Sequence, residues 1–558
     1  MAKLPFAPSD VGDMNRRSFL KVAGGVTGAV VLHSAVPRPL LAQFGHRRDS
    51  VPAITDPAIN ALVFNGVQAA RDAGAQYVDV RLTHGVVRDV SVHNVNDFRM
   101  LHVGVRALVN GYWGFASGPL WTEEAVVSLA RRAAVQAQET SSSASLMKTI
   151  DVAEFPKIDV VRNGHWEMPV KTDPLSVHPF IVQDYLQGLS DQIPPRFGRK
   201  PGDNANVQAT AKFFVQERAF GSSEGSYCTQ RLYLTSGTLQ VGLSVQIGNG
   251  RDGGFRSINL VSPSGSGWEL FSDQPLCETG ARSLREIRAE TELPAKPATP
   301  GKFNILLDAV TVARALSQTV GAASEIDRAL GYEANSTGMS YLNDPANMLG
   351  KFPVGAPMLT VTANRSESGG AATVKWDDEG VAPRPFTIVK DGVFHDYHLS
   401  RDGVMWLRNQ KVTRHEQPHG VVQASQASHQ PHIQTANLEM KPSSTEAGDR
   451  ELMEQAQDGV VFEDANISMD PLRLNGMIGG GRAYEFKGGK KVARIINPAV
   501  LVYTPELWKS LHLLGGERSK VRTGHVALKG EPVQASYHSV TAVPAVFREQ
   551  TVFDMRVR

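Results

Sequence analysis

The sequence predicts an α+β protein of two domains, divided near residue 300. Three observations lead to this prediction. Several segments alternate apolar and polar residues, as half-buried strands do. Other segments carry apolar residues at helical spacing. A stretch rich in proline and alanine, residues 292–302, separates two such groups of segments and predicts a linker.

The composition describes an ordinary globular protein. The chain has 558 residues, of which 41% are apolar and 20% charged. These fractions exclude a disordered chain, a coiled coil and a collagen-like fibre. The formal charge of +2 argues against a nucleic-acid binder that works by bulk electrostatics. The length exceeds what one hydrophobic core usually supports, which again favours more than one domain.

The first 42 residues predict an export signal. Arg16 and Arg17 precede a short apolar, glycine-rich stretch at 22–32, and the small residue Ala42 stands before Gln43. This order is typical of a twin-arginine signal peptide, so we expect a periplasmic or secreted protein that begins with a spacer at 43–57. A membrane-spanning helix needs ~20 apolar residues, so we expect no membrane span.

The chain contains two cysteines, Cys228 and Cys277. Export to an oxidising compartment would permit a disulfide between them, but two separate buried thiols fit the sequence equally well. Two cysteines are too few for a cysteine-rich zinc or iron–sulfur site.

The N-terminal domain is predicted to cover residues 58–295. It begins with an amphipathic helix at 58–73 and a strand at 76–90. Residues 101–116 alternate around Asn110-Gly111, which is the strongest short signal for a hairpin.

Further elements of this domain follow from caps and turn residues. Thr122 is expected to cap a helix that has two glutamates in its first turn. A strand-rich region is expected at 209–247, with turns at 221–223 and at Gly237, and a helix at 283–292.

The C-terminal domain is predicted to cover residues 302–558. We expect a strand at 303–307 and one continuous helix at about 309–330. Short strands and turns dominate the remainder. The glycine run 479–481 has no helical pattern after it, so it indicates close strand packing or a bulge.

One stretch matches a zinc-protease motif in letters only. His415-Glu416-Gln417-Pro418-His419 reads H-E-x-x-H, whose chemistry requires both histidines on one helix face. Pro418 would break that helix, so we interpret the match as accidental. The four histidines of this region could still bind a metal loosely, although a polar surface loop is the simpler interpretation; they are His415, His419, His429 and His432.

Several longer segments resemble the TldD/PmbA family of metallopeptidase-like proteins. The segments are EIDRALGYEAN (325–335), GMSY (338–341), WDDEGV (376–381), KDGV (390–393), YVDVR (77–81), GVR (104–106) and WGFA (113–116). The resemblance covers roughly residues 58 to 555. It implies two domains, the second a strongly curved, barrel-like β domain against which the helix of the metal site packs.

The resemblance also implies where catalytic residues would lie. Active members carry H-E-x-x-x-H before the Asp-Arg segment, and a third ligand, a cysteine, near the C-terminus. Counting back from Asp327, the first histidine corresponds to Ser317, the glutamate to Gln318 and the second histidine to Ala322. The cysteine position corresponds to Ala542, in a stretch that keeps His538.

These replacements remove the groups that a zinc peptidase requires. A catalytic zinc needs about three protein ligands and an open position. Serine is a poor zinc ligand, alanine is none, and glutamine does not accept a proton as glutamate does. We therefore expect no metal, no cofactor and no intact catalytic residue, at Ser317, Gln318, Ala322 or Ala542.

The polar residues of this region have two interpretations. They would form a peptide-binding wall of the former active cleft, or they would cap helices and form structural ion pairs, which we favour for Glu325, Asp327 and Arg328. The candidates for peptide binding are Glu325, Asp327, Arg328, His419 and His538. The acidic run 377–379 before Gly380 predicts a tight turn more strongly than a metal site. Ser317 would act as a nucleophile only with a nearby base and an oxyanion hole, and no G-x-S-x-G motif surrounds it.

Three hypotheses for function follow from the resemblance. The first is a metal-free subunit that supports peptide binding and proteolysis in a homodimer, or in a heterodimer with a catalytic relative. The second is a periplasmic peptide-binding protein without catalysis. The third is an active metallopeptidase with relocated ligands. The expected partner is in each case a peptide or an unfolded protein segment.

Overall fold

A computed structural model describes residues 51–556, apart from 144–149, 199, 248–249, 259, 261–262 and 413–416. The predicted signal peptide lies outside the described residues. So do His415 and Glu416 of the H-E-x-x-H stretch. No helix among the described residues is both long and apolar enough to cross a membrane.

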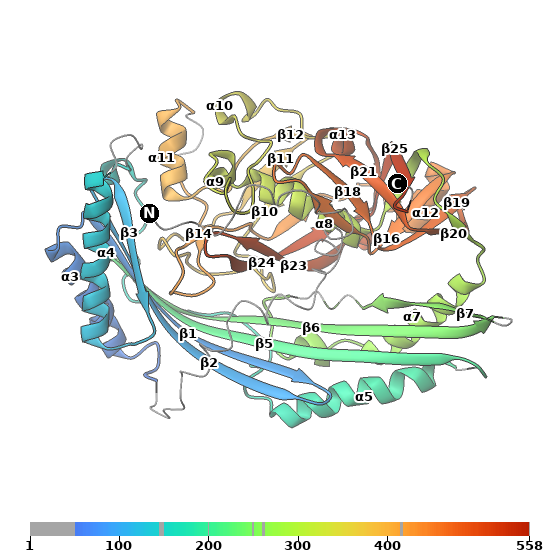
Figure 1. Ribbon diagram of the computed structural model, residues 1–558, viewed down its shortest axis with the longest axis horizontal. Coiled ribbons are helices and arrows are strands. Elements are labelled where there is room, and N and C mark those ends of the chain that lie inside the picture. The colour runs from blue at the N-terminus through green and yellow to red at the C-terminus, as the bar shows by residue number, and fades with distance from the viewer. Residues whose placement is uncertain are drawn as a thin grey trace, which may run out of the picture. The chain divides into compact units, whose positions relative to one another are not determined.

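The first half of the chain builds a seven-stranded sheet (Figure 1). Its main path is β3-β2-β1-β5-β6-β4, and β7 pairs with β6. All pairs are antiparallel except β4 with β6. The strands are β1 (Tyr77–Ser91), β2 (Val95–Val109), β3 (Tyr112–Gly118), β4 (Gly164–Glu167), β5 (Asn204–Ser222), β6 (Tyr227–Ile247) and β7 (Gly250–Ser257).

The predicted hairpin is confirmed, and one predicted turn is wrong. Asn110 and Gly111 both have positive φ, 49° and 85°, and join β2 to β3. Gly237, by contrast, lies inside β6 and pairs with Ala211 of β5. A Cβ atom at residue 237 would lie 2.4 Å from the ring of Phe271. The glycine therefore allows a close approach of the covering segment, and it makes no turn.

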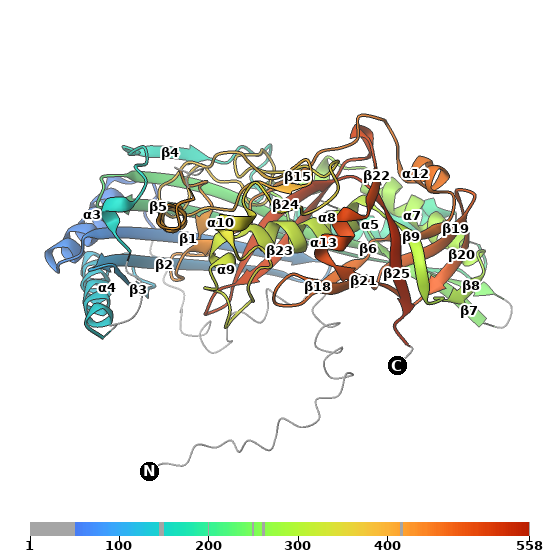
Figure 2. The ribbon, with the colours of Figure 1, turned by 90° about the horizontal axis from the view of Figure 1, so that it is seen from above.

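Helices cover one face of this sheet (Figures 1 and 2). Asp56 caps the first of them, and Thr122 caps the next as predicted, accepting a hydrogen bond from the Ala125 amide at 3.4 Å. The last begins well before the predicted start at residue 283. The helices are α3 (Pro57–Asp72), α4 (Glu123–Ser143), α5 (Pro179–Phe197), α6 (Glu269–Ser272) and α7 (Leu276–Thr291).

Strand β1 is buried on both faces rather than on one. Val78 and Val80 point toward α3 and α4 and belong to their apolar core. Asp79 and Arg81 alternate with them and are also buried, because the second half of the chain covers that face. The alternation in the sequence therefore separates a helix-covered apolar face from a polar face inside the molecule.

The second half of the chain builds three further sheets. The six-stranded sheet has the order β12-β11-β10-β15-β24-β23, and a ten-stranded sheet is centred on β25, β9 and β16. Within the described residues each has free edges, so the barrel expected from the resemblance is not closed. Six strands form the first sheet: β10 (Val361–Ala363), β11 (Phe386–Lys390), β12 (Val393–Phe394), β15 (Leu438–Met440), β23 (Val521–Lys529) and β24 (Gln534–Ala542). Ten form the second: β8 (Ala295–Pro297), β9 (Gly301–Leu307), β16 (Gly459–Glu463), β17 (Asn466–Met469), β18 (Asn475–Gly479), β19 (Arg482–Lys487), β20 (Lys490–Ile496), β21 (Pro498–Tyr503), β22 (Leu511–Leu514) and β25 (Ala545–Asp554). The two-stranded sheet consists of β13 (Val422–Gln423) and β14 (His432–Ile433).

The continuous helix expected at 309–330 is broken. Helix α8 (Ala309–Leu316) passes into a π-helical turn (Ser317–Gly321), then into a 3-10 turn (Ala322–Ser324). Glu325 is extended, with φ −75° and ψ 119°, and bridges to His398, before the short helix α9 (Ile326–Ala329). Tertiary pairing with residue 398 thus interrupts a segment whose own pattern is helical throughout. The other helices are α10 (Pro345–Met348), α11 (Arg401–Asn409), α12 (Asp449–Ala456) and α13 (Thr504–Lys509).

The predicted linker is structured on both sides of residue 300. Residues 295–297 pair with β20, and residues 301–307 lie inside the ten-stranded sheet. The largest hydrophobic core uses only residues beyond 297, whereas the two helix-covered cores use residues before 288. Contacts between the halves nevertheless make 54–558 one compact unit. Cys228 and Cys277 are both free thiols, and Cys228 is buried.

Candidate functional site

The π-helical turn after α8 brings Ser317 and Ala322 onto one side of the segment. In an α-helix, residues five apart point in different directions, whereas an i→i+5 turn aligns them. The Ala322 amide donates to the Ser317 carbonyl, which closes this turn. The turn packs tightly on β15, since a Cβ atom at Gly321 would lie 2.8 Å from Leu438 and from Thr435. The backbone therefore holds together the two positions at which the resemblance places a pair of histidines.

Ser317 contacts a histidine from the far end of the chain. Its Oγ lies 2.9 Å from Nε2 of His538 on β24, and both side chains are buried. His538 Nδ1 makes no hydrogen bond to a described residue, and the ring stacks on His525 of β23 at 5.3 Å. Burial lowers the pKa of His538 to about 4, so the ring is neutral at pH 7.

A second buried histidine has a tautomer fixed by its partners. His398 Nε2 accepts a hydrogen bond from the Ala436 amide at 3.0 Å. Its Nδ1 lies 3.0 Å from the Ser324 hydroxyl, which itself donates to the Gly321 carbonyl. The ring must therefore carry its proton on Nδ1. Burial lowers its pKa to about 3, so the ring is neutral, and it ties the 3-10 turn to the segment that leads into β15.

Next to these histidines lies a group of ion pairs, which we call the site cluster: Glu325, Asp327, Arg328 and Lys529. Lys529 Nζ lies 2.7 Å from carboxylate oxygens of both Glu325 and Asp327, and it also donates to the Ile433 carbonyl. Arg328 Nε donates to Glu325 at 2.7 Å. Two cations face two carboxylates, so the cluster balances its own charge.

The electrostatics of the site cluster separate its two carboxyl groups. Burial opposes ionisation of both. For Glu325, Lys529 and Arg328 outweigh burial and lower the pKa well below its usual range. For Asp327, burial and repulsion from Glu325 prevail over Lys529 and raise the pKa to about 6. Glu325 and Arg328 are buried, and Asp327 keeps part of its surface.

The residue at which the resemblance places a glutamate takes part in an arginine contact. Gln318 accepts a hydrogen bond from Arg473 Nη1 at 2.7 Å. Arg473 also donates to the Thr337 carbonyl, and Arg328 donates to the same oxygen at 2.9 Å. Gln318 thus helps to hold the 333–338 turn. Ala542 lies further along β24, fully buried.

The described histidines of the 419–432 region lie in three separate places. His419 is buried, stacked on Phe386 at 3.9 Å, with Nδ1 donating to the Tyr397 carbonyl. His429 Nδ1 lies 2.9 Å from the Ser425 hydroxyl. His432 lies near Lys529, and burial together with the charge of Lys529 lowers the pKa of His432 to about 3. The prediction of a polar surface loop in this region is therefore wrong for His419, which is buried. Among the described residues, no three His, Cys, Asp or Glu side chains are grouped so as to hold a metal ion.

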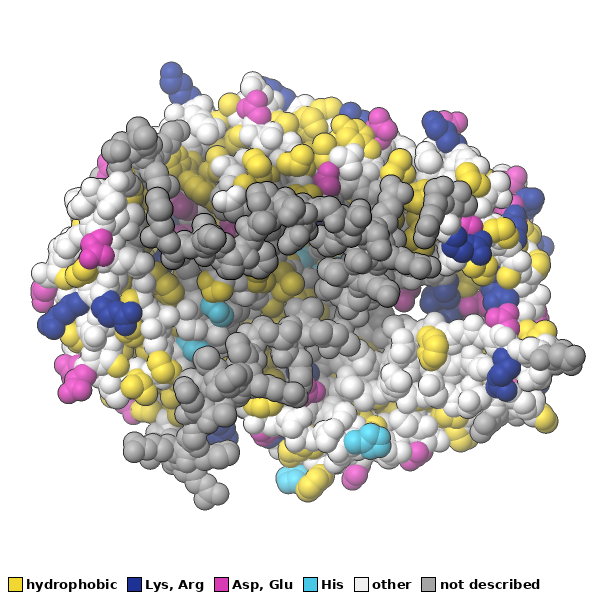
Figure 3. Space-filling view, in the orientation of Figure 1, with side chains coloured by type: hydrophobic (Ala, Val, Ile, Leu, Met, Phe, Trp, Pro, Cys, Tyr) yellow, Lys and Arg dark blue, Asp and Glu magenta, His cyan; other side chains and the backbone are white. Residues whose placement is uncertain are grey.

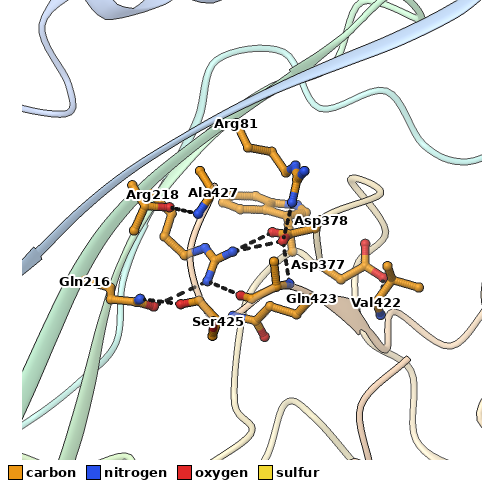
Figure 4. Close-up of polar contacts among 12 residues, drawn as sticks. Arg81, Gln216, Arg218, Asp377, Asp378, Val422, Gln423, Ser425 and Ala427 are labelled. Atoms are coloured by element: carbon orange, nitrogen blue, oxygen red, sulfur yellow. Dashed lines mark hydrogen bonds and ion pairs between the residues drawn. The ribbon is translucent and has the colours of Figure 1, made fainter. Parts of the chain in front are cut away.

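The acidic run 377–379 forms the predicted turn, and it lies inside the molecule. The Gly380 amide donates to the Asp377 carbonyl, and Gly380 has φ 76°. Burial raises the pKa of Glu379 to about 8 and that of Asp377 to about 6. Asp378 meets arginines of the seven-stranded sheet (Figure 4).

We call this second group the interface cluster: Asp79, Arg81, Arg106, Arg218 and Asp378. Arg218 Nη2 binds both oxygens of Asp378, at 2.8 and 2.9 Å, and Arg81 binds one of them at 3.3 Å (Figure 4). Arg106 binds Asp79 at 2.8 Å. Arg218 and Arg81 lower the pKa of Asp378 although its burial opposes them. The cluster joins the polar face of the sheet to the loops of the second half.

The side chains at the π-turn do not fit the zinc ion that the resemblance implies. Ser317 offers a hydroxyl already bonded to His538, and Ala322 offers a methyl group. The nearby carboxylate Glu325 is occupied by Arg328, Lys529 and Thr435. A protein zinc site needs about three ligands, and the described residues around this turn contain no such group of three His, Cys, Asp or Glu side chains.

Sequence reasoning missed several residues of this site. Lys529, His398, His525 and Arg473 come from four separate parts of the chain, and none lies in a recognisable motif. Lys529 alone carried a signal, because it ends a strand-like run directly before Gly530, which has φ 84°. The motif at 325–335 contains three members of the site cluster, and Lys529 is the fourth, which the motif does not contain.

On this face of the molecule, basic and acidic side chains are interspersed (Figure 3), as the formal charge of +2 leads one to expect. No large area of a single sign is visible among the residues coloured there.

Comparison with known proteins agrees with the geometry. Residues 300–547 match the model of the PmbA/TldA metallopeptidase C-terminal domain, and residues 76–137 match the model of PmbA/TldA metallopeptidase domain 1. A metalloprotease of Methanocaldococcus jannaschii is 24% identical over 399 residues, which are 69% of this chain and 78% of that protein.

Two solved structures share the fold. A protein of Bacteroides thetaiotaomicron described as a putative modulator of DNA gyrase superimposes with a TM-score of 0.63 at 15% identity, covering 90% of this chain and all of that one. TldE of Thermococcus kodakarensis superimposes with a TM-score of 0.61 at 12% identity, covering 89% of this chain and 99% of that one.

Proposed function

This chain belongs to the TldD/PmbA family, and from that premise we propose that it is a metal-free subunit that supports peptide binding and proteolysis within a homodimer or heterodimer. In a heterodimer, the partner is a TldD-like relative with intact metal ligands. We propose a periplasmic or extracellular complex, because the first 42 residues have the order typical of a twin-arginine signal peptide.

One observation carries the proposal. The π-turn that would hold a ligand pair holds Ser317 against His538 instead, and balanced ion pairs occupy the adjacent carboxylate. A catalytic zinc requires an open coordination position and free donor atoms. Here the donors are already used within the fold, so the segment supports structure.

The five peptide-binding candidates act in this proposal by shaping the wall of the cleft. Glu325 and Arg328 bond to each other, and His419 and His538 are packed against aromatic or histidine rings. Four of the candidates carry a carboxyl or imidazole group, and of these four only Asp327 is partly exposed. Asp327 is therefore the candidate for a direct contact with a peptide amide.

The first test is the metal content of the mature protein. The chain is purified after folding in zinc-supplemented medium and measured by elemental mass spectrometry. We expect no stoichiometric metal. About one tightly held zinc per chain would contradict the proposal. The matched control restores the family's three ligands and the glutamate, as Ser317→His, Ala322→His, Ala542→Cys and Gln318→Glu, and should gain zinc.

The second test concerns the partner. A tagged mature chain is used to capture proteins from the same compartment, and an unfolded peptide is then incubated with the chain alone and with the captured complex. We expect cleavage by the complex and none by the chain alone. Cleavage by the metal-free chain alone would refute the subunit role, and binding of peptide without any partner or cleavage would favour a periplasmic peptide-binding protein.

A further inference from the structure

A small cavity lies between the seven-stranded sheet and β24, on the side of β24 away from α8. It encloses about 60 Å³. Phe214 and Leu234 of the sheet form its apolar wall, and Tyr537 of β24 lies across from them. In such measures one water needs ~10–15 Å³, so the cavity holds a few waters or one small chemical group.

Two buried arginines line this cavity. Arg218 and Arg365 are 4% and 1% exposed. Arg218 shares its carboxylate partner, Asp378, with Arg81. Arg365 donates to the Ala372 and Gly420 carbonyls and to the Gln423 side chain, and it binds no carboxylate. Burial lowers its pKa to about 10 although the nearby charges of Asp377 and Asp378 oppose this effect, so Arg365 remains charged at pH 7.

Other polar groups of the lining keep unused donors. Tyr537 Oη and Arg218 Nε make no hydrogen bond to any described residue. The side-chain amide nitrogen of Gln423 likewise has no partner among the described residues, although its oxygen accepts from Arg365. Among the described residues, no aspartate or glutamate lines the cavity. The lining thus combines two cations and several free donors with no negative charge.

This combination matches one kind of chemical group. A carboxylate has two acceptor oxygens, and guanidinium and hydroxyl donors bind it most strongly when charge assists the hydrogen bond. The apolar wall and the small volume favour a carboxylate that carries a small hydrocarbon group over a bulky polyanion.

We propose that this cavity binds a carboxylate attached to a small apolar group, held by Arg218, Arg365 and Tyr537. The carboxylate has two candidate sources, the C-terminal residue of a peptide and a free small organic acid. The first source rests on the peptide-handling function proposed above, whereas the second does not.

Binding is tested with three probes on the whole mature chain by isothermal titration calorimetry. The probes are tri-alanine with a free C-terminus, the same peptide with a C-terminal amide, and N-acetylalanine. A charge-assisted contact contributes about tenfold or more in affinity, so we expect the free acid to bind at least about tenfold more tightly than the amide.

Two variants connect binding to the cavity. Tyr537→Phe removes one hydroxyl that has no partner in the fold, and it should weaken binding of the free acid about fivefold. Leu234→Trp fills the space without changing a polar group and should abolish binding. Tyr503→Phe, at an exposed tyrosine on β21, is the matched control and should bind as the unchanged protein does.

The outcomes separate the two sources and the two proposals. Tighter binding of the tripeptide acid than of N-acetylalanine supports the site with a peptide as its source. Equal or tighter binding of N-acetylalanine supports the site with a small acid as its source. If tripeptide acid and amide bind equally, or if Leu234→Trp binds as before, the carboxylate site is wrong while peptide handling stands. If none of the probes binds, the carboxylate site is also wrong.

Discussion

The site cluster and the interface cluster are both buried groups of charges, and they differ in how their charges balance. The site cluster pairs Arg328 and Lys529 with Glu325 and Asp327. The interface cluster sets three arginines against two aspartates, Asp79 and Asp378. In both clusters each charge has an opposite partner. The second cluster has three arginines to two aspartates, and one of these arginines, Arg218, lines a cavity.

This difference separates the region where the resemblance places an active site from the region of the proposed carboxylate site. In the first region, hydrogen bonds and ion pairs within the chain use the donors. Where cations exceed carboxylates, donors remain for a ligand. Buried charge without a partner is costly, so an excess of buried cations is retained only where something offsets it.

The largest expected effect comes from breaking the interface cluster. Asp378→Ala leaves Arg218 and Arg81 buried with no shared carboxylate, and we expect it to lower the free energy of unfolding by about 3–5 kcal/mol. Urea unfolding followed by circular dichroism measures this. The control, Glu454→Ala, breaks the exposed pair with Arg450 and should change stability by less than about 1 kcal/mol. Equal effects of the two variants would mean that the interface cluster stabilises the fold no more than an exposed ion pair does.

The second effect is a pH dependence that comes from the neutral histidine of the site. The pKa of His538 falls from 6.5 to about 4 on folding, so the unfolded chain binds a proton at a higher pH than the folded chain does. Its contribution to stability is therefore complete above pH 6.5 and is lost as the pH falls toward 4, by about 3 kcal/mol. His538→Gln should flatten the curve of unfolding free energy against pH in this range. An unchanged slope would show that the pKa of His538 is the same in the folded and the unfolded chain.

A smaller effect tests the serine that replaces a ligand. Ser317→Ala removes the hydrogen bond to His538 and should cost about 1–2 kcal/mol of stability. It should leave peptide cleavage by the complex unchanged, because Ser317 is structural in the proposed function. Loss of cleavage in a folded variant would instead assign a catalytic role to Ser317. Ser142→Ala, at an exposed position of α4, is the control for stability.

The smallest effect concerns the part of the fold that local sequence specifies. Gly111→Ala places a methyl group at φ 85° in the β2–β3 turn and should destabilise the protein by about 1 kcal/mol. Gly188→Ala, inside α5 with no close neighbour, should instead stabilise it by about 0.5–1 kcal/mol. Thermal unfolding of both variants compares them. A gain in stability from Gly111→Ala would contradict the turn geometry.

Local patterns were sufficient for much of the N-terminal half. Asn110-Gly111 has the positive φ values that its hairpin requires, and Thr122 caps α4, because both depend on residues within a few positions. The alternation around Val78 likewise predicted strand β1. It did not predict the burial of Asp79 and Arg81, because the segments that cover them lie hundreds of residues away in the sequence.

The candidate site divides in the same way. The family segments follow from the sequence, and the expectation that Ser317, Gln318 and Ala322 stand at ligand and catalytic positions rests on the resemblance. The π-turn does not, because residues 309–330 carry a helical pattern and only pairing of Glu325 with His398 interrupts it. Contacts of Ser317 with His538, and of Glu325 with Lys529, each join residues more than 200 positions apart. The sequence by itself therefore determined the family and many of the local elements, whereas the tertiary structure decided which charges meet, since that depends on long-range packing and not on any local pattern.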